Sequence, residues 1–98
     1  MLRNASRGSL VELVEVRQMG NSYRLVEFYV NPKYIVSVYD HEPTRNLTES
    51  MSQLGLSEKA DFSTVIIKES HRSKEIQVVG CARTIYLKLN SRRGLLKG

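Results

Sequence analysis

Hydrophobic and polar residues alternate along much of the chain with the two-residue period of β-strands that bury one face. Residues 10–19 (LVELVEVRQM) and 23–30 (YRLVEFYV) show this pattern and are rich in β-branched and aromatic side chains. Gly20, Asn21 and Ser22 lie between them and are typical turn residues. The two segments therefore predict an antiparallel hairpin.

A third strand is predicted at residues 34–40 (YIVSVYD), directly after Asn31 and Pro32. Proline lacks an N–H donor and disfavours helix before it, so this step separates the second strand from the third. The third strand is apolar with little alternation, which predicts contacts on both faces. It would be a central strand or a strand at a subunit contact.

Strand patterning resumes at residues 62–69 (FSTVIIKE) and 74–79 (KEIQVV), with a turn at 70–73. The predicted fold class is therefore mainly β, with five antiparallel strands in meander order. Five short strands can curl into a small barrel of SH3 or Sm type. An open sheet with a helix across one face is the alternative.

The polar insertion at residues 41–60 predicts a short helix, with a mobile loop as the alternative. Asn46 and Glu49 have the spacing of a capping box. Three apolar residues recur at positions i, i+4 and i+7: Leu47, Met51 and Leu54.

The segment after Gly80 fits two patterns. Residues 84–89 (TIYLKL) alternate as a strand would. Four residues also fit one helical face: Ala82, Ile85, Tyr86 and Leu89. We predict a helix, because Gly80 breaks the preceding strand and a closing helix would cover an open end of the sheet.

A chain of 98 residues is large enough for one domain and too small for a second independent core. We expect a single β domain at residues 10–90. A flexible basic N-terminus at 1–9 and a flexible basic tail at 91–98 would flank it.

Positive charge is concentrated at the two ends of the chain. Residues 8–82 contain eight Lys or Arg and ten Asp or Glu, whereas the ends carry seven cations and no acid. The cations from residue 83 onward are predicted to bind nucleic acid or another anion: Arg83, Lys88, Arg92, Arg93 and Lys97. Exposed strand tyrosines could stack unpaired bases.

Apolar residues of the third strand and of the tail are predicted to contact a partner or a second copy. The strand contributes Tyr34, Val36 and Val38, and the tail contributes Leu95 and Leu96. A short linear segment of this kind can dock on a neighbouring protein, with the leucines as anchors and the arginines setting the register.

The inventory of catalytic residues is small. His41, His71 and Cys81 lack the short recurring spacings of zinc ligands, so no metal or cofactor is expected. Cys81 near a helix start would have a lowered pKa, and the alternative is a small buried residue at a strand–helix joint. Asp40 and Glu42 flank His41 and hint at a polar pocket. The sequence predicts a protein that is not an enzyme.

One cysteine cannot form an internal disulfide, and the first nine residues are polar and basic rather than a leader sequence. No apolar run approaches the roughly 20 residues that span a bilayer. These features predict a cytoplasmic protein that does not bind a membrane.

Residues 28–38 (FYVNPKYIVSV) resemble a pattern in small β proteins of the flagellar FlbD type and in short phage-encoded proteins. In those chains an Asn–Pro step joins two strands, a strand like 63–67 (STVII) follows, and a short helix ends the domain. The likeness covers about 60 of the 98 residues. It implies a compact sheet, self-association, regulatory work through partners and no catalytic residues.

The functional expectation is a small, self-associating regulatory or accessory protein of phage or bacterial origin, which binds a host or viral macromolecule, preferably a protein. An RNA- or DNA-binding module that uses the basic C-terminal segment is one alternative. An oligomeric sponge for a small nucleotide, held by arginines and tyrosines at subunit junctions, is another.

Overall fold

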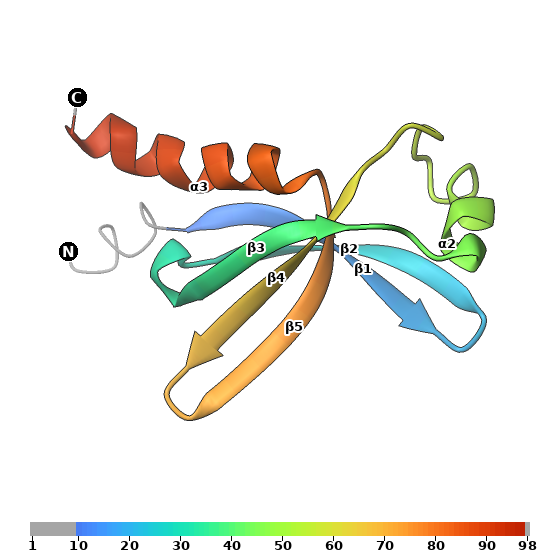
Figure 1. Cartoon of the computed structure of the whole chain (residues 1–98), viewed down its shortest axis with the longest axis horizontal. Coiled ribbons are helices and arrows are strands. Elements are labelled where there is room, and N and C mark those ends of the chain that lie inside the picture. Colours follow the sequence, from blue (N-terminus) through green and yellow to red (C-terminus); the bar gives the residue numbers. More distant parts are fainter. Residues whose placement is uncertain (1–9, 98) are drawn as a thin grey trace.

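The protein is one five-stranded antiparallel sheet with two α-helices (Figure 1). The computed structural model describes the backbone of residues 10–97 and the side chains of residues 10–90. The elements in chain order are β1 (Val11–Met19), β2 (Ser22–Val30), the 3₁₀ turn η1 (Pro32–Tyr34), β3 (Ile35–His41), α2 (Arg45–Ser50), β4 (Phe62–Glu69), β5 (Arg72–Val79) and α3 (Ala82–Lys97). The predicted mainly β class is confirmed.

Two hairpins form the regular part of the sheet. β1 and β2 pair without interruption from Val11↔Val30 to Met19↔Ser22. Gly20 begins the two-residue connection with a φ of 64°, a backbone conformation that glycine adopts without strain. β4 and β5 pair from Phe62↔Val79 to the end of the hairpin. The first hairpin was predicted from the alternating pattern, and the strands of the second were predicted on either side of a turn at 70–73.

The strand order is β2-β1-β5-β4-β3, which corrects the predicted meander. β5 pairs with β1, and β2 and β3 are the two edges of the sheet. The chain turns away from β2 at η1, where Pro32 has no N–H donor and Asn31 Oδ1 accepts a hydrogen bond from the Lys33 N–H. The sheet is not closed, so the barrel is not confirmed.

β3 is an edge strand, and the expectation of a central strand was wrong. Its apolar character has a different cause. Ile35 and Val38 pack against the core on one face of the sheet, and the same core contains Ile85 and Leu89 of α3. α3 therefore covers one face of β3, whereas the sequence predicted contacts on both faces.

Two hydrophobic clusters lie on opposite faces of the sheet, because successive residues of a strand point to opposite sides. Val78 of β5 belongs to the first cluster, with α3, and its neighbour Val79 packs against the second. The second cluster contains Val16, Leu47, Met51 and Phe62. α2 and the loop after it form its cover and lie beside β2 (Figure 1).

The N-cap of α2 lies two residues before the predicted capping box. Thr44 is its N-cap, and the Thr44 hydroxyl accepts a hydrogen bond from the Leu47 N–H at 3.2 Å. Asn46 therefore lies inside the helix, and its role as a cap was wrong. Thr44 precedes a buried Leu47 and has the extended backbone that an N-cap requires. The predicted apolar stripe is confirmed, because Leu47 and Met51 are buried.

The start of α3 is fixed by contacts from distant parts of the chain. The Gly80 N–H donates to the Asp61 carbonyl at 2.7 Å, and the Ala82 N–H donates to Asp40 Oδ1 at 2.8 Å. Gly80 has a φ of 117°, and a Cβ there would lie 3.2 Å from the Ile85 side chain. The predicted C-terminal helix is confirmed, and it continues to Lys97, into the segment expected as a tail.

Candidate functional site

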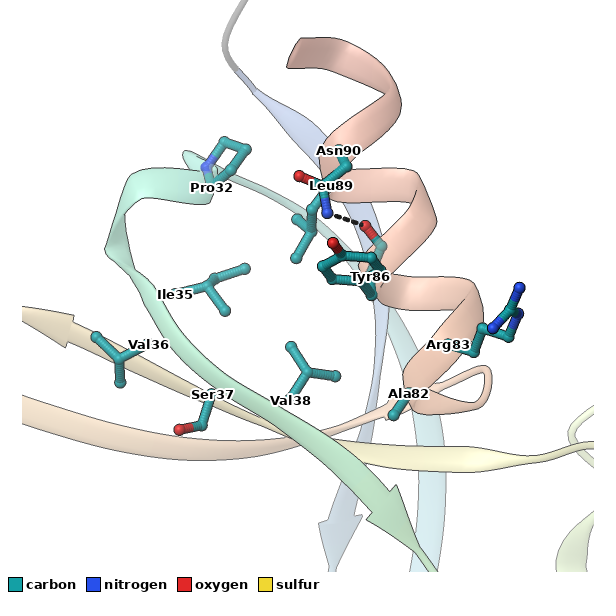
Figure 2. A pocket seen from close by; sticks show the side chains of 10 residues that line it. All are labelled: Pro32, Ile35, Val36, Ser37, Val38, Ala82, Arg83, Tyr86, Leu89 and Asn90. Carbon is teal, nitrogen blue, oxygen red and sulfur yellow. Dashed lines mark hydrogen bonds between the residues drawn. The ribbon is translucent and has the colours of Figure 1, made fainter. Parts of the chain in front are cut away.

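A surface hollow lies between the edge strand β3 and α3, and we call it the β3–α3 groove (Figure 2). It is open to solvent and has a volume of about 530 Å³. Its lining residues come from η1 and β3 on one side and from α3 on the other: Pro32, Ile35, Val36, Ser37, Val38, Ala82, Arg83, Tyr86, Leu89 and Asn90.

The groove follows the backbone of the edge strand. Four consecutive residues of β3, from Ile35 to Val38, line the groove. Consecutive residues of a strand point to opposite faces of the sheet, so the groove includes the edge of β3 as well as one of its faces. The lining residues of α3 are spaced as one stripe of a helix. Asp40 binds the Ala82 N–H at one end and Pro32 lines the other, so strand and helix run in opposite directions.

β3 has an irregular register at this edge. Ile35 pairs with Ile67 and Ser37 pairs with Ile66, so Val36 is an extra residue that forms a β-bulge. The Val36 side chain is 57% exposed. On its other side, β3 has no strand partner in the described sheet, which leaves backbone donors and acceptors at the groove.

The floor of the groove is apolar and its rim is polar. Ile35, Val38 and Leu89 belong to or pack against the core cluster, and in Figure 2 their side chains point into the space between strand and helix. Tyr86 stands on the rim and is 60% exposed. Asn90 Nδ2 donates to the Tyr86 carbonyl at 3.0 Å, which fixes the amide beside the ring. The arrangement can enclose an apolar side chain and offer hydrogen bonds around it.

Arg83 is the charged residue among those that line the groove. Its side chain is exposed and extends from the first turn of α3 (Figure 2). In the part of the chain with described side chains, no acid forms an ion pair with it. The guanidinium is therefore available to an anionic group that enters the groove.

The residues predicted for partner contact are divided by the structure. Val36 and Val38 line the groove. Tyr34 lies in η1 outside the lining, with the Lys33 ammonium 5.5 Å from its ring centre. The side chains of Leu95 and Leu96 lie outside the described residues.

The residues predicted for anion binding all fall on α3. Arg83 lines the groove, whereas Lys88 is exposed elsewhere on the helix and already has a partner. Arg92, Arg93 and Lys97 belong to the last turns, and their side chains lie outside the described residues.

Sequence reasoning selected Val36, Val38 and Arg83 and missed the other lining residues, among them Tyr86 and Asn90. Tyr86 was placed on the same helical face as Ile85 and Leu89, which are buried. Neighbouring positions of a helix are about 100° apart, so Tyr86 reaches only the edge of the buried face. The signal in the sequence was the tyrosine hydroxyl, because a tyrosine beside the buried position 85 tends to keep its polar end at the surface.

A second hollow contains the polar residues that the sequence singled out near the end of β3. Asp40, His41, Glu42 and Cys81 are among its lining residues. His41 Nδ1 is hydrogen-bonded to the Thr64 hydroxyl at 3.1 Å, and Cys81 Sγ is bonded to the Thr84 hydroxyl at 3.2 Å. Each potential reactive group therefore has a structural partner of its own.

The pKa of the Cys81 thiol is lowered, and the main cause is the hydrogen bond that the Thr84 hydroxyl makes to the thiolate. The predicted direction of this pKa shift is confirmed. His71 lies in the turn between β4 and β5, far along the strands from Cys81. In residues 10–90, no group of three or more His, Cys, Asp or Glu side chains is arranged to hold a metal ion.

No protein-family pattern, curated protein or solved structure matches this chain. Within the described residues, neither helix is long and apolar enough to cross a bilayer.

Proposed function

We propose that this protein is a small, self-associating, non-enzymatic accessory protein that acts by binding a protein partner through the β3–α3 groove. The observation that carries the proposal is an open strand edge beside an apolar groove. Extended segments of other proteins bind such edges through main-chain hydrogen bonds, and neighbouring pockets select their side chains. The likeness to FlbD-type proteins, which rests on the sequence pattern, agrees with work through partners.

Exposed apolar side chains support this surface. The large hydrophobic residues that are exposed on β3 and α3 are Val36, Tyr39, Tyr86 and Leu87. The remaining ones in the described chain, Met19 and Tyr29, lie on β1 and β2. Val36 and Tyr86 line the groove, and exposed apolar residues beside a concave surface are typical of protein interaction sites.

The lining of the groove also supports binding rather than catalysis. It includes the hydroxyl of Ser37 but no histidine, cysteine or carboxylate that could activate this hydroxyl. The proposal that the protein is not an enzyme rests on this composition and on the separate structural partners of His41 and Cys81.

The binding proposal is tested by affinity purification from the source cells with the wild type and two variants. Tyr86→Ser changes the groove rim, and Tyr29→Ser is the matched control, because Tyr29 is 64% exposed on the other edge strand. We expect at least one protein to be retained by the wild type and the control and lost with Tyr86→Ser. A set of retained proteins that is the same for all three would contradict the proposal.

Self-association is tested by light scattering across a range of protein concentrations. β2 pairs regularly with β1 over nine residues and has no strand on its outer side in the described sheet, and such open edges can pair with other strands. We expect the average mass to exceed that of the 11.2 kDa chain as concentration rises. A monomer at all concentrations would contradict this part of the proposal.

Nucleic-acid binding is the second candidate, and the distribution of charge on α3 favours it. The helix carries five cations and no acid between residues 82 and 97. A labelled oligonucleotide should then bind with an affinity that falls steeply with salt and after removal of residues 91–98. Binding that is indifferent to both changes would rule out this candidate.

A further inference from the structure

We infer that the β3–α3 groove receives an extended acidic segment of a partner protein, which pairs with β3 as a sixth strand. This inference rests on the proposed function and names the chemistry of the partner. It requires a segment with main-chain groups for the strand edge, an apolar side chain for the floor and a carboxylate for Arg83.

The dimensions of the groove fit a short extended segment. Lining residues run from Ile35 to Val38 on the strand, about 10 Å at strand spacing. They run from Ala82 to Asn90 on the helix, about 12 Å at 1.5 Å per residue. The two walls therefore have similar lengths, and each matches about four residues of a strand.

An added strand places alternate side chains on the two sides of the sheet. Those on the α3 side would contact Ile35, Val38 and Leu89, whose apolar surfaces form the groove floor. Burial of one aliphatic side chain there would favour binding, because it removes apolar surface from water. Tyr86 and Asn90 lie at the rim, where they would cover the segment and separate this apolar contact from solvent.

The charge around the groove selects an acidic segment. Arg83 lines it without an ion-pair partner in the described chain, and none of the lining residues is an acid. The nearby Asp40 carboxylate already accepts the Ala82 N–H and neutralises the start of α3. The remaining cations of α3 extend the positive potential along the helix.

Charge also disfavours a second copy as the occupant. Antiparallel pairing of two β3 edges would bring two α3 helices toward each other, each with five cations and no acid. A nucleic acid would satisfy the cations, but it has no peptide groups to pair with the strand edge, and one cation alone lines the groove. Self-association would then use the β2 edge.

The test measures the binding of synthetic octapeptides to the full chain by fluorescence anisotropy. The first peptide alternates valine with glutamate, and the second alternates valine with lysine. The third has the first sequence with N-methyl groups on alternate amides, which removes donors for strand pairing. We expect the glutamate peptide to bind about tenfold more tightly than either of the others, one factor of ten corresponding to about 1.4 kcal/mol.

Variants assign the binding to the groove. Arg83→Glu should reverse the order of the glutamate and lysine peptides, and an acid in the first turn of α3 should not destabilise the helix. Arg24→Glu makes the same change in charge on the exposed face of the other edge strand and should preserve the order. Tyr86→Ser should weaken the binding of the glutamate peptide without changing the far-UV circular dichroism of the protein.

Each other result overturns the inference. Equal binding of the glutamate and lysine peptides would contradict selection of an acidic segment by charge. Binding of the methylated peptide as tight as that of the unmethylated one would contradict main-chain pairing with β3. Loss of peptide binding as the protein self-associates would assign the groove to a second copy. Tighter binding of oligothymidylate, or a thermal shift with a nucleotide that Arg83→Glu abolishes, would assign it to a phosphate ligand. If a cellular partner depends on Tyr86 and the peptides fail, the proposed function stands and the acidic-strand inference falls.

Discussion

α2 and α3 cover opposite faces of the same sheet, but they enclose their faces to different degrees. On the α2 side, Leu47 and Phe62 are 1% and 2% exposed, and the loop after the helix packs against the same cluster. On the α3 side, Ile85 and Leu89 are buried, yet a groove remains between the helix and β3.

The shorter helix encloses its face of the sheet more completely than the longer one does, which is opposite to what helix length suggests. α2 has six residues and would be marginal as an isolated helix, whereas α3 has sixteen. The short helix depends on complete packing for its existence. The long helix gains stability along its own backbone and can leave part of its face unpacked. The β3–α3 groove therefore lies beside the helix whose stability depends less on complete packing.

The largest expected effect comes from the same Leu→Ala change in the two helices. Leu47→Ala should lower the free energy of unfolding by about 2–5 kcal/mol, because it leaves a cavity in a closed cluster. Leu87→Ala should change it by no more than about 0.5 kcal/mol, because the side chain is exposed. Urea denaturation followed by circular dichroism measures both. Equal losses would mean that the Leu87 side chain is packed as fully as that of Leu47.

The junction before α3 should give the next largest effect. Gly80→Ala combines a φ that L-residues rarely adopt with a Cβ 3.2 Å from Ile85 Cδ1, and should cost about 1–3 kcal/mol. Ile85→Val removes that Cδ1, so Gly80→Ala can be compared in the presence and absence of the close contact. In urea denaturation, the double variant should lose less than the sum of the single losses. Strict additivity would show that backbone strain alone is responsible.

Smaller effects are expected from the two helix caps. Thr44 caps α2 from the adjacent position, whereas Asp40 binds the start of α3 from 42 residues away. Thr44→Ala and Asp40→Ala should each cost about 1 kcal/mol in urea denaturation. Asp40→Asn keeps an acceptor oxygen and should retain most of the stability.

The two caps should differ in their effect on the groove. Asp40→Ala removes a bond that joins β3 to α3, and it should also weaken binding of the glutamate peptide. Thr44→Ala should leave that binding unchanged. If both variants bind the peptide as the wild type does, the bond from Asp40 does not maintain the groove.

The elements of the fold were predictable because their signals are local. Alternation identified the first two strands, runs of strand-forming residues identified the other three, and Gly80 separated β5 from α3. The order of the strands was not predictable in the same way, because a two-residue period does not say which strand lies beside which. The pairing of β1 with β5 joins residues 15 and 78 and depends on the path of the chain through η1.

The groove was predictable in part, although the central position expected for its strand was wrong. Val36 and Val38 were selected because their strand is apolar, which was attributed to a central position or a subunit contact. In the structure, Val38 packs against the core below α3, and Val36 is exposed at a bulge. The position of Tyr86 on the rim depends on how α3 lies across the sheet, and helical spacing alone does not determine that orientation.

The smallest expected effect is confined to the first turn of α3. The Thr84 hydroxyl stabilises the Cys81 thiolate, so Thr84→Val should raise the pKa of the thiol, measured by thiolate absorbance in the ultraviolet during a pH titration. Because the native pKa lies below the unfolded value, this interaction stabilises the fold at alkaline pH. That stability is lost as the pH falls through the native pKa. Thr48→Val, in α2, is the control and should leave the titration of Cys81 unchanged. An unchanged midpoint in Thr84→Val would show that the helix start itself, rather than the hydroxyl, lowers the pKa.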